Sequence, residues 1–398
     1  MAVAADRTNG TVSPGRLLYD PRFRAILLQL AVLAVVVAGV YWIVRNTVDN
    51  LRRANIASGF GFFDARAGFD IGQSLISFTS TDTIARAFVV GVLNTLLVAV
   101  LGIIIATFVG LLIGLARLSP NWLLARLGTV YVETLRNVPL LLLLLFWYRA
   151  VLSVLPGPRQ GFALPFGGIN LSNRGLTLPA PVYGPGFWMT AVTLFVAALA
   201  AIGVSTWARR RRIQTGQPFP TGWVVLALLV VPAAVVFVAT GAPLAWDIPE
   251  LQGFNFSGGI SLKPELVALL IGLSAYTAAF IAEVVRAGIL SVSHGQTEAA
   301  RAIGLRPGQT LRLVVLPQAV RVIIPPLTNQ YLNLTKNSTL AVAIGYPDFV
   351  AVFAGSVMQR TGQAVEVIFI TMLFYLAVSL ATALLMNWFN RATAIRER

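Results

Sequence analysis

Four polar side chains lie on one helical face of an otherwise apolar segment, residues 322–345. Asn329, Asn333, Lys336 and Asn337 are spaced at i, i+4, i+7 and i+8, which places them on the same side of a helix. Facing lipid, the Lys336 ammonium would cost about 2.5–3.5 kcal/mol, so the face must meet protein or water. An ammonium and amides at mid-membrane can bind the carboxylate of a solute, which favours a substrate path.

Polar residues interrupt the same segment at positions 328–330 and 333–339, and the second interruption includes Ser338 and Thr339. Broken helices with polar groups at mid-membrane are typical of the substrate sites of transporters. The sequence leaves an alternative open, in which Lys336 pairs with an acid such as Glu283 and only joins two helices.

Glu283 and Arg286 are spaced at i, i+3 near the end of the preceding apolar segment, residues 266–285. An ion pair within one helix is the simpler interpretation and is worth about 0.5 kcal/mol. The functional interpretation is a linkage between a gate and the loop that follows. Tyr276 and Thr277 lie one to two turns deeper, where they either line a path or pack in the core; packing is favoured.

Composition excludes several kinds of chemistry. The chain has no cysteine, so it has no disulfide, thiolate metal site or cysteine nucleophile. Its single histidine, His294, is interpreted as a turn residue, so no metal site is expected. Its two lysines, Lys263 and Lys336, do not lie in a G-x-x-x-x-G-K-[ST] loop, which excludes a Walker-type ATPase. We therefore expect neither a catalytic residue nor a cofactor on this chain.

The composition is that of a membrane protein, with 57% hydrophobic and 11% charged residues, against about 25% charged in soluble proteins. Eight apolar segments are predicted to cross a bilayer, at residues 25–44, 87–116, 140–155, 187–208, 223–240, 266–285, 322–345 and 365–388. Gly110 and Gly114 in the second segment could let another helix approach closely. The predicted fold is an all-α polytopic membrane protein.

The formal net charge of +15 comes from arginines that flank the apolar segments, which favours the positive-inside rule over nucleic-acid binding. An even number of spans places both basic termini on one side, together with the arginines at 209–212 and the loop 295–317. We predict that this side is cytoplasmic. The loop 45–86 argues against this orientation, because it carries five arginines on the opposite side.

The loop 295–317 cannot lie in the bilayer, because Glu298, Arg301, Arg306 and Arg312 would each cost about 2.5–3.5 kcal/mol at its centre. Its apolar residues nonetheless follow a helical spacing.

Ala299, Ala300 and Ile303 form a small apolar patch of helical spacing, and Gly304 breaks the helix that carries it. Residues 306–308 turn the chain, and a second helix is predicted to begin near Leu311.

This loop matches a known motif at every spacing. It resembles the EAA motif of ABC importer permeases, EAA-x3-G-x9-I-x-LP, through Glu298, Ala299, Ala300, Gly304, Leu316 and Pro317. The one departure is Val314 in place of isoleucine. The resemblance implies a helix-turn-helix whose first helix docks in a groove on a cytoplasmic ATPase. The apolar patch would enter the groove, and Glu298 and Arg301 would pair with its rim.

Further stretches are similar to the general L-amino-acid permeases of the polar amino-acid uptake family. Residues 134–141, 280–289 and 334–340 resemble the family's TxRGxPLL, YxAExxRGGI and LKDTSL segments. The first contains Arg136, with Asn137 where glycine is commoner, and the last has Asn337 in place of aspartate. None of these stretches falls in residues 156–264.

The resemblance divides the chain into parts. The predicted outer parts are a cytoplasmic arm, first span and periplasmic loop at residues 1–86, and a cytoplasmic tail at residues 391–398. Between them an ABC transporter type-1 permease domain takes residues 87–390. Its type I core of five spans lies at 87–155 and 265–390, and a helix pair is inserted at 156–264.

The resemblance implies a permease subunit that moves L-amino acids across the bacterial inner membrane, driven through the EAA loop by a separate ATPase. The implied partners are a second, different permease chain, a dimer of ABC ATPases holding ATP and magnesium, a periplasmic amino-acid-binding protein and membrane lipid, without nucleic acid.

Together, the residue patterns and the resemblance assign roles to individual residues. The substrate path would take the polar residues of the seventh span with Tyr276 and Thr277, and Glu283, Arg286 and Arg136 would support the gate or coupling. The alternative is an ATP-independent secondary transporter or channel for small polar solutes. It would need an ion-coupling carboxylate inside the membrane, and only Glu283 qualifies.

Overall fold

The computed structural model describes residues 21–53, 58–164 and 167–393. Residues 1–20 of the predicted arm and residues 394–398 of the predicted tail lie outside the described residues. The α-helices are α2 (Pro21–Arg53), α3 (Ile84–Ala116), α4 (Trp122–Asn137), α5 (Leu140–Leu145), α6 (Phe187–Thr215), α7 (Thr221–Ala239), α8 (Pro264–Leu290), α9 (His294–Ala302), α10 (Pro307–Thr310), α11 (Leu316–Asn337), α12 (Met358–Thr361) and α13 (Ala364–Thr393).

Shorter helical elements and strands complete the described chain. The 3₁₀ helices are η1 (Gly61–Asp64), η3 (Pro158–Gln160) and η5 (Ser338–Ile344). The π helices are η2 (Phe146–Leu152), η4 (Leu311–Val315) and η6 (Val350–Val357). The strands are β1 (Phe162–Ala163), β2 (Asn170–Ser172), β3 (Gly175–Leu178), β4 (Ala180–Tyr183), β5 (Leu244–Asp247), β6 (Glu250–Gln252), β7 (Asn255–Ser257) and β8 (Ile260–Leu262).

Within the described residues, seven helices are long and apolar enough to cross a membrane, or eight if a bent pair counts as one more. The bent pair includes the predicted third span: the helix Leu140–Leu152 meets α4 at 107°. Val138 adopts an extended conformation ahead of Pro139, because a proline disfavours helical geometry in the residue before it. Leu140–Leu152 alone is about 20 Å long, less than a bilayer core of about 30 Å. The third span is therefore a broken one.

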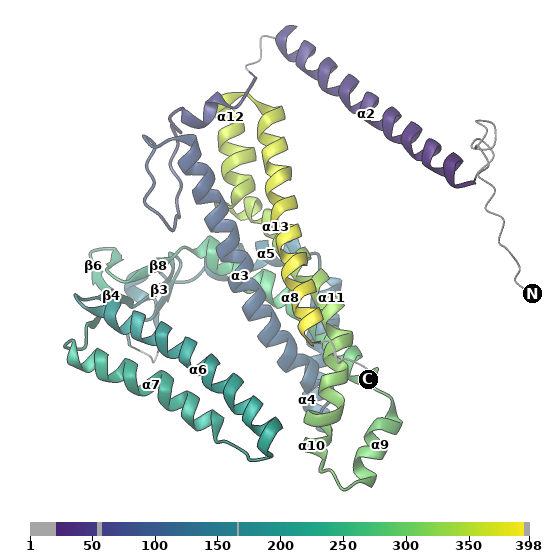
Figure 1. Cartoon of the computed structure of the whole chain (residues 1–398). Helices are drawn as coiled ribbons and strands as arrows, with labels where there is room; N and C mark the ends of the chain where they lie inside the picture. Colours follow the sequence, from purple (N-terminus) through teal and green to yellow (C-terminus); the bar gives the residue numbers. More distant parts are fainter. Residues whose placement is uncertain (1–20, 54–57, 165–166, 394–398) are drawn as a thin grey trace, which may run out of the picture.

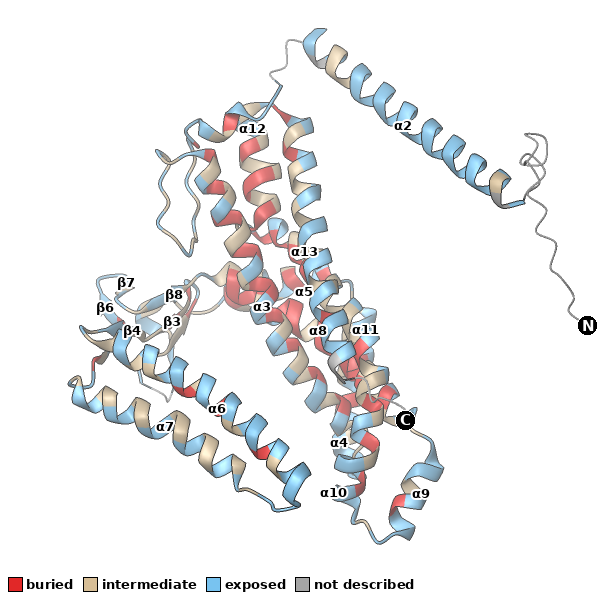
Figure 2. Cartoon of the chain, viewed as in Figure 1, coloured by how far each residue is buried: buried red, intermediate tan, exposed pale blue. Residues whose placement is uncertain are grey.

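Helices α3 and α8 form the centre of the molecule, where buried residues are concentrated (Figures 1 and 2). A Cβ atom at Gly110 would lie 2.7 Å from the Cβ of Ile281, and one at Gly114 would lie 2.9 Å from the carbonyl oxygen of Ala282. Any side chain at these two positions would force the helices apart. The close approach predicted for this glycine pair is confirmed, and the helix that approaches is α8.

The seventh span begins earlier than predicted and breaks at one place. Helix continues from Pro307 through α10, η4 and α11 to Asn337, so the predicted interruption at residues 328–330 is wrong. The Thr328 hydroxyl donates to the carbonyl oxygen of Ile324 at 3.0 Å, which satisfies this polar group inside the helix. The second predicted interruption is confirmed in part, because α-helix gives way to the 3₁₀ helix η5 at Ser338.

Elements η6 and α12 form a helical segment that the sequence analysis missed, between the seventh and eighth spans. They lie beside the start of α13 at the end of the bundle remote from α9 (Figure 1), which we call the α12 end. Aromatic rings fill this end: Phe349 lies 5.2 Å from Phe353 and 4.2 Å from Phe374, measured between ring centroids. The apolar stretch was too short to predict as a span.

The inserted region contains the predicted helix pair, α6 and α7, which pack against each other (Figure 1). The loops predicted around them instead form strands, in one four-stranded sheet of order β1–β2–β3–β8 and two two-stranded sheets. Strand β3 pairs antiparallel with β8, aligning Leu176 with Leu262. The proline, glycine and asparagine residues that indicated loops lie largely at the turns between short strands. Both ends of the insertion are therefore held together.

Helix α2 lies apart from the rest of the described chain and is exposed along most of its length (Figure 2). An apolar helix without protein cover requires lipid around it. It continues to Arg53, so Arg45, Arg52 and Arg53 belong to this helix and not to the loop to which the sequence analysis assigned them. The arginine-rich loop that follows this helix is accordingly shorter than predicted.

The glycine contact between α3 and α8 gives a first prediction. Gly110→Val places a branched side chain against Ile281 and the Ala278 carbonyl, so we expect it to destabilise the chain by about 1–3 kcal/mol. Gly203→Val is the matched control, because Gly203 lies in α6 with open space around it. The measurement is the thermal unfolding midpoint of each purified variant in detergent. Equal midpoints for the two variants would contradict the importance of this contact.

Candidate functional site

The loop predicted to fold as a helix-turn-helix does so, with α9 projecting from the end of the bundle opposite α12 (Figure 1). Gly304 has a φ of +85°, a left-handed conformation that favours glycine. Its N–H donates to the Arg301 carbonyl at 2.9 Å, and the Leu305 N–H donates to the Ala300 carbonyl at 3.1 Å. These two bonds form a Schellman motif, which ends α9 and reverses the chain where Gly304 was predicted to break it.

The three residues of the predicted docking patch do not share one environment. Ala300 is buried, at 3% exposure, on the side of α9 that meets α10 and η4. Ala299 is exposed and Ile303 is 78% exposed, and they are flanked by the exposed Glu298 and Arg301. The patch open to a partner is therefore Ala299 with Ile303, whereas Ala300 holds the two helices of the hairpin together.

The last two motif residues, Leu316 and Pro317, are also exposed and lie where the π helix η4 passes into α11. Pro317 does not end the second helix, because the preceding turn widens to π geometry. The helix therefore continues from η4 into α11 through Pro317, although proline has no N–H group to donate. His294, for which no metal role was expected, lies 3.3 Å from Glu298 across one turn of α9.

Three arginines converge on Glu283 at the α9 end of the bundle. The predicted pair is confirmed, with Arg286 Nη2 2.8 Å from Glu283 Oε1. Arg117 Nη1 donates to Glu283 Oε2, and Arg136 Nη1 lies 3.8 Å from the same oxygen. The carboxylate therefore joins α8 to the end of α3 and to the last turn of α4.

The sequence analysis did not assign Arg117 to this site. In the structure its side chain is only 8% exposed. The available signal was its position, as the first charged residue after the apolar residues of the second span. The alternative in which Lys336 pairs with Glu283 is wrong, because the arginines occupy this carboxylate. Lys336 forms no ion pair in the part of the chain that the structure describes.

The polar face of α11 is left open by this chain. Asn329, Asn333 and Lys336 are exposed, and Asn337 is half-buried at the same face. On its opposite side α11 packs on the core: Leu334 is fully buried and lies against Gly102, near the middle of α3. The uncovered ammonium and amides thus sit deep within the span, where lipid would not solvate them.

The other residues predicted for the path are more enclosed. Thr277 and Ser338 are buried, and the Ser338 hydroxyl donates to the Thr335 carbonyl at 2.8 Å. Tyr276 is partly buried, with its ring 5.0 Å from that of Phe280, and Thr339 is half-buried. The packing interpretation favoured for Tyr276 and Thr277 agrees with this placement.

Comparisons with known proteins identify the group to which the chain is related. A family described as "Binding-protein-dependent transport system inner membrane component" matches residues 210–395. The general L-amino acid transport system permease protein AapQ of Rhizobium johnstonii is 53% identical over 96% of this chain and 95% of its own length. The chain belongs to the family of amino-acid ABC transporter permeases.

Two further members of this family are similar over nearly their whole length. The putative amino-acid ABC transporter permease protein YhdX of Escherichia coli is 51% identical, over 95% of this chain and 96% of its own. The glutamate/glutamine/aspartate/asparagine transport system permease protein BztB of Rhodobacter capsulatus is 42% identical over 100% of both chains. The inserted region of this permease is therefore included in these matches, and the alternative of an ATP-independent transporter is set aside.

The arginine cluster gives a second prediction. Glu283→Gln removes the charge that holds Arg117, Arg136 and Arg286, so we expect this permease to lose about 2–3 kcal/mol of stability. Glu133→Gln, an exposed position of α4 with no ion pair among the described residues, makes the same chemical change without the cluster. Thermal unfolding in detergent compares the two. A loss of similar size in both variants would mean that the cluster contributes little.

Proposed function

We propose that this permease carries L-amino acids across a bacterial inner membrane as one subunit of an ATP-driven importer. The observation that carries the proposal is the uncovered polar face of α11, with Lys336 and two asparagines exposed within a membrane span. Such a face needs water or a second subunit opposite it. A water-filled path between two permease subunits satisfies both requirements, and the ammonium suits the carboxylate common to amino acids.

The coupling proposal places the partner ATPase at α9. Ala299 and Ile303 form a compact exposed apolar surface between Glu298 and Arg301, which a groove with a charged rim would cover. The Schellman turn and the buried Ala300 make the hairpin stiff. Through the Glu283 cluster, movement of the α9 end reaches α3, α4 and α8 together.

We further infer that the α9 end is cytoplasmic and that both termini lie on that side. The C-terminal end of α6, which carries the four arginines at 209–212, points toward the α9 end (Figure 1). The positive-inside rule then places both on the inner side. The proposed complex contains a second, different permease chain, two ABC ATPase subunits and a periplasmic amino-acid-binding protein.

The docking proposal is tested with Ile303→Arg. A charge at this exposed position would be buried against the ATPase groove, so we expect the ATPase to co-purify at least about tenfold less well, a loss of about 1.4 kcal/mol. Ile213→Arg in α6 is the matched control, because Ile213 has the same residue type and the same exposure of 78%. Co-purification in mild detergent, with identification of the bound subunits, measures both. Retention of the ATPase by Ile303→Arg would overturn the proposed docking surface.

The path proposal is tested with Lys336→Ala and Asn333→Leu in complexes reconstituted into vesicles. We expect ATP-dependent uptake of amino acids to fall about tenfold or more, because the polar lining of the path is removed. Leu373→Ala, at an exposed apolar position of α13, controls for the effect of mutating a span surface. Unchanged uptake of every amino acid by assembled Lys336→Ala and Asn333→Leu complexes would rule out this path.

A further inference from the structure

Opposite charges flank the first residue of α8, at the junction with the inserted sheet. Lys263 follows β8 and precedes Pro264, and Glu265 occupies the second position of the helix. Strand β8 is paired with β3, so the sheet fixes the chain immediately before these residues. Their location is at the end of α8 remote from α9, on the side of the membrane that the proposed orientation makes external.

The two charges are not paired with each other. Within the described chain, neither Lys263 nor Glu265 forms an ion pair. Glu265 Oε1 accepts a bond from the Tyr148 hydroxyl at 3.1 Å, whereas Oε2 is buried and has no hydrogen-bond partner among the described residues. A buried carboxylate oxygen without a donor is costly, and rotation of the Glu265 side chain toward the cavity that it lines would bring this oxygen to a donor from a ligand.

A second acceptor in the same condition stands nearby. The side-chain oxygen of Gln73 is buried without a partner among the described residues. Gln73 is held in place through its backbone, since its carbonyl accepts a bond from Asn94 Nδ2 at 2.8 Å. Lys263 Nζ lies over the neighbouring Gly72, 3.0 Å from where a Cβ would stand. Lys263, Glu265 and Gln73 therefore line the same cavity.

Two cavities meet at these residues. One, of about 260 Å³, lies between the loop with Gln73 and the connection after η5; the other, of about 590 Å³, lies between α8 and the sheet. Lys263 and Glu265 line both. The larger one is in the size range of small-molecule sites and is bordered by polar side chains, including Asn173, Arg174 and Thr177.

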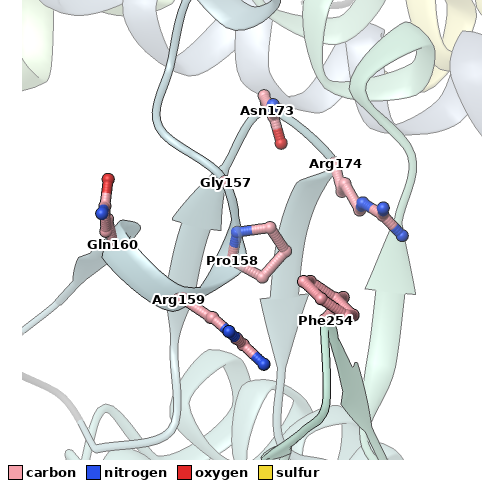
Figure 3. Close-up of a pocket in the computed structure, with 7 residues that line it drawn as sticks. All are labelled: Gly157, Pro158, Arg159, Gln160, Asn173, Arg174 and Phe254. Carbon is pink, nitrogen blue, oxygen red and sulfur yellow. The ribbon is translucent and has the colours of Figure 1, made fainter.

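The larger cavity continues into a third hollow, which shares Pro158, Asn173 and Arg174 with it. Figure 3 shows Asn173, Arg174 and Phe254 around Pro158, with Gln160 pointing away. Polar and aromatic side chains of the inserted region thus line the hollow that continues from the charged junction.

We propose that this junction is an outer binding site for the zwitterionic group shared by α-amino acids, which rests on the proposed function. The Lys263 ammonium binds the α-carboxylate, and the oxygens of Glu265 and Gln73 accept from the α-ammonium. The amino-acid side chain extends into the larger cavity, toward Asn173 and Arg174. The inserted sheet is then a receiving surface placed ahead of the path along α11.

The charge pattern explains why a zwitterion is the ligand class. An anion alone would leave the Glu265 oxygen unsatisfied, and a cation alone would face the Lys263 ammonium. An α-amino acid supplies both charges on one carbon, and each bond to it is charge-assisted. The site binds only the α-carboxylate and the α-ammonium, and the larger cavity leaves room for the side chain. Many amino acids can therefore bind. Weak binding is required, because the substrate must leave for the path.

The test uses the absence of cysteine from this chain. Ser261→Cys places one thiol in the lining of the larger cavity, and its labelling rate by a maleimide reports occupancy in the purified complex. We expect about 10 mM L-alanine to slow labelling at least about threefold. Alaninamide, which lacks the carboxylate, and N-acetylalanine, which lacks the ammonium, should not protect.

Variants identify the groups responsible. Lys263→Met or Glu265→Gln in the Ser261→Cys background should abolish protection by L-alanine, whereas Glu250→Gln on strand β6 should retain it. Absence of protection in the parent, or equal protection by all three compounds, would overturn the proposal. Protection that survives both Lys263→Met and Glu265→Gln would overturn it as well.

Transport measurements separate this proposal from the proposed function. If the parent complex fails to take up amino acids with ATP, the function is wrong, whatever the labelling shows. If the parent transports and L-alanine gives no protection, only the outer site is wrong. With both correct, Lys263→Met should lower uptake at least about threefold while ATPase stimulation by the loaded binding protein persists. Loss of that stimulation in Lys263→Met would show that Lys263 contacts the binding protein and would overturn the assignment.

Discussion

The contact between α3 and α8 is the constraint on which the rest of this permease depends. Two glycines remove the side chains that would separate the helices, and the Arg117–Glu283 bond closes the same interface a turn further on. Apolar packing inside a membrane gains little from exclusion of water, so close backbone approach and polar bonds must hold the helices together. With α3 and α8 fixed, the other helices of the core have a surface to pack on.

A rigid centre has a mechanical meaning for a permease. Two backbone hydrogen bonds close the turn of the α9 hairpin, and the arginine cluster joins α3, α4 and α8 at the same end of the bundle. The irregular helices η4, η5 and η6 follow one another along the chain that leads from the hairpin to the polar face and beyond it. The ion pairs thus lie beside the proposed docking helix, and the irregular helices flank the proposed substrate path.

The sequence predicted the features that depend on a few residues close together in the chain. Gly304, the glycine pair and the Glu283–Arg286 spacing were interpretable because a left-handed turn, a close approach and an i, i+3 pair each depend on few residues. The convergence of Arg117 and Arg136 on Glu283 could not be predicted, since it joins positions far apart in the sequence, 166 residues in the case of Arg117. Burial of Ala300 but not Ala299 also depends on how the hairpin folds back. The paired strands of the insertion were hidden by short length and by proline and glycine between them.

The pairing of β3 with β8 has a consequence for how the inserted region can vary. Because β3 and β8 are paired neighbours, the chain between them, residues 179–259, departs from and returns to one place in the sheet. Shortening or exchanging this segment would leave β3 and β8 in register, since a tight turn with little loop-closure entropy could join the two strands. This segment can therefore vary in length and sequence without a change in the packing of α3 on α8.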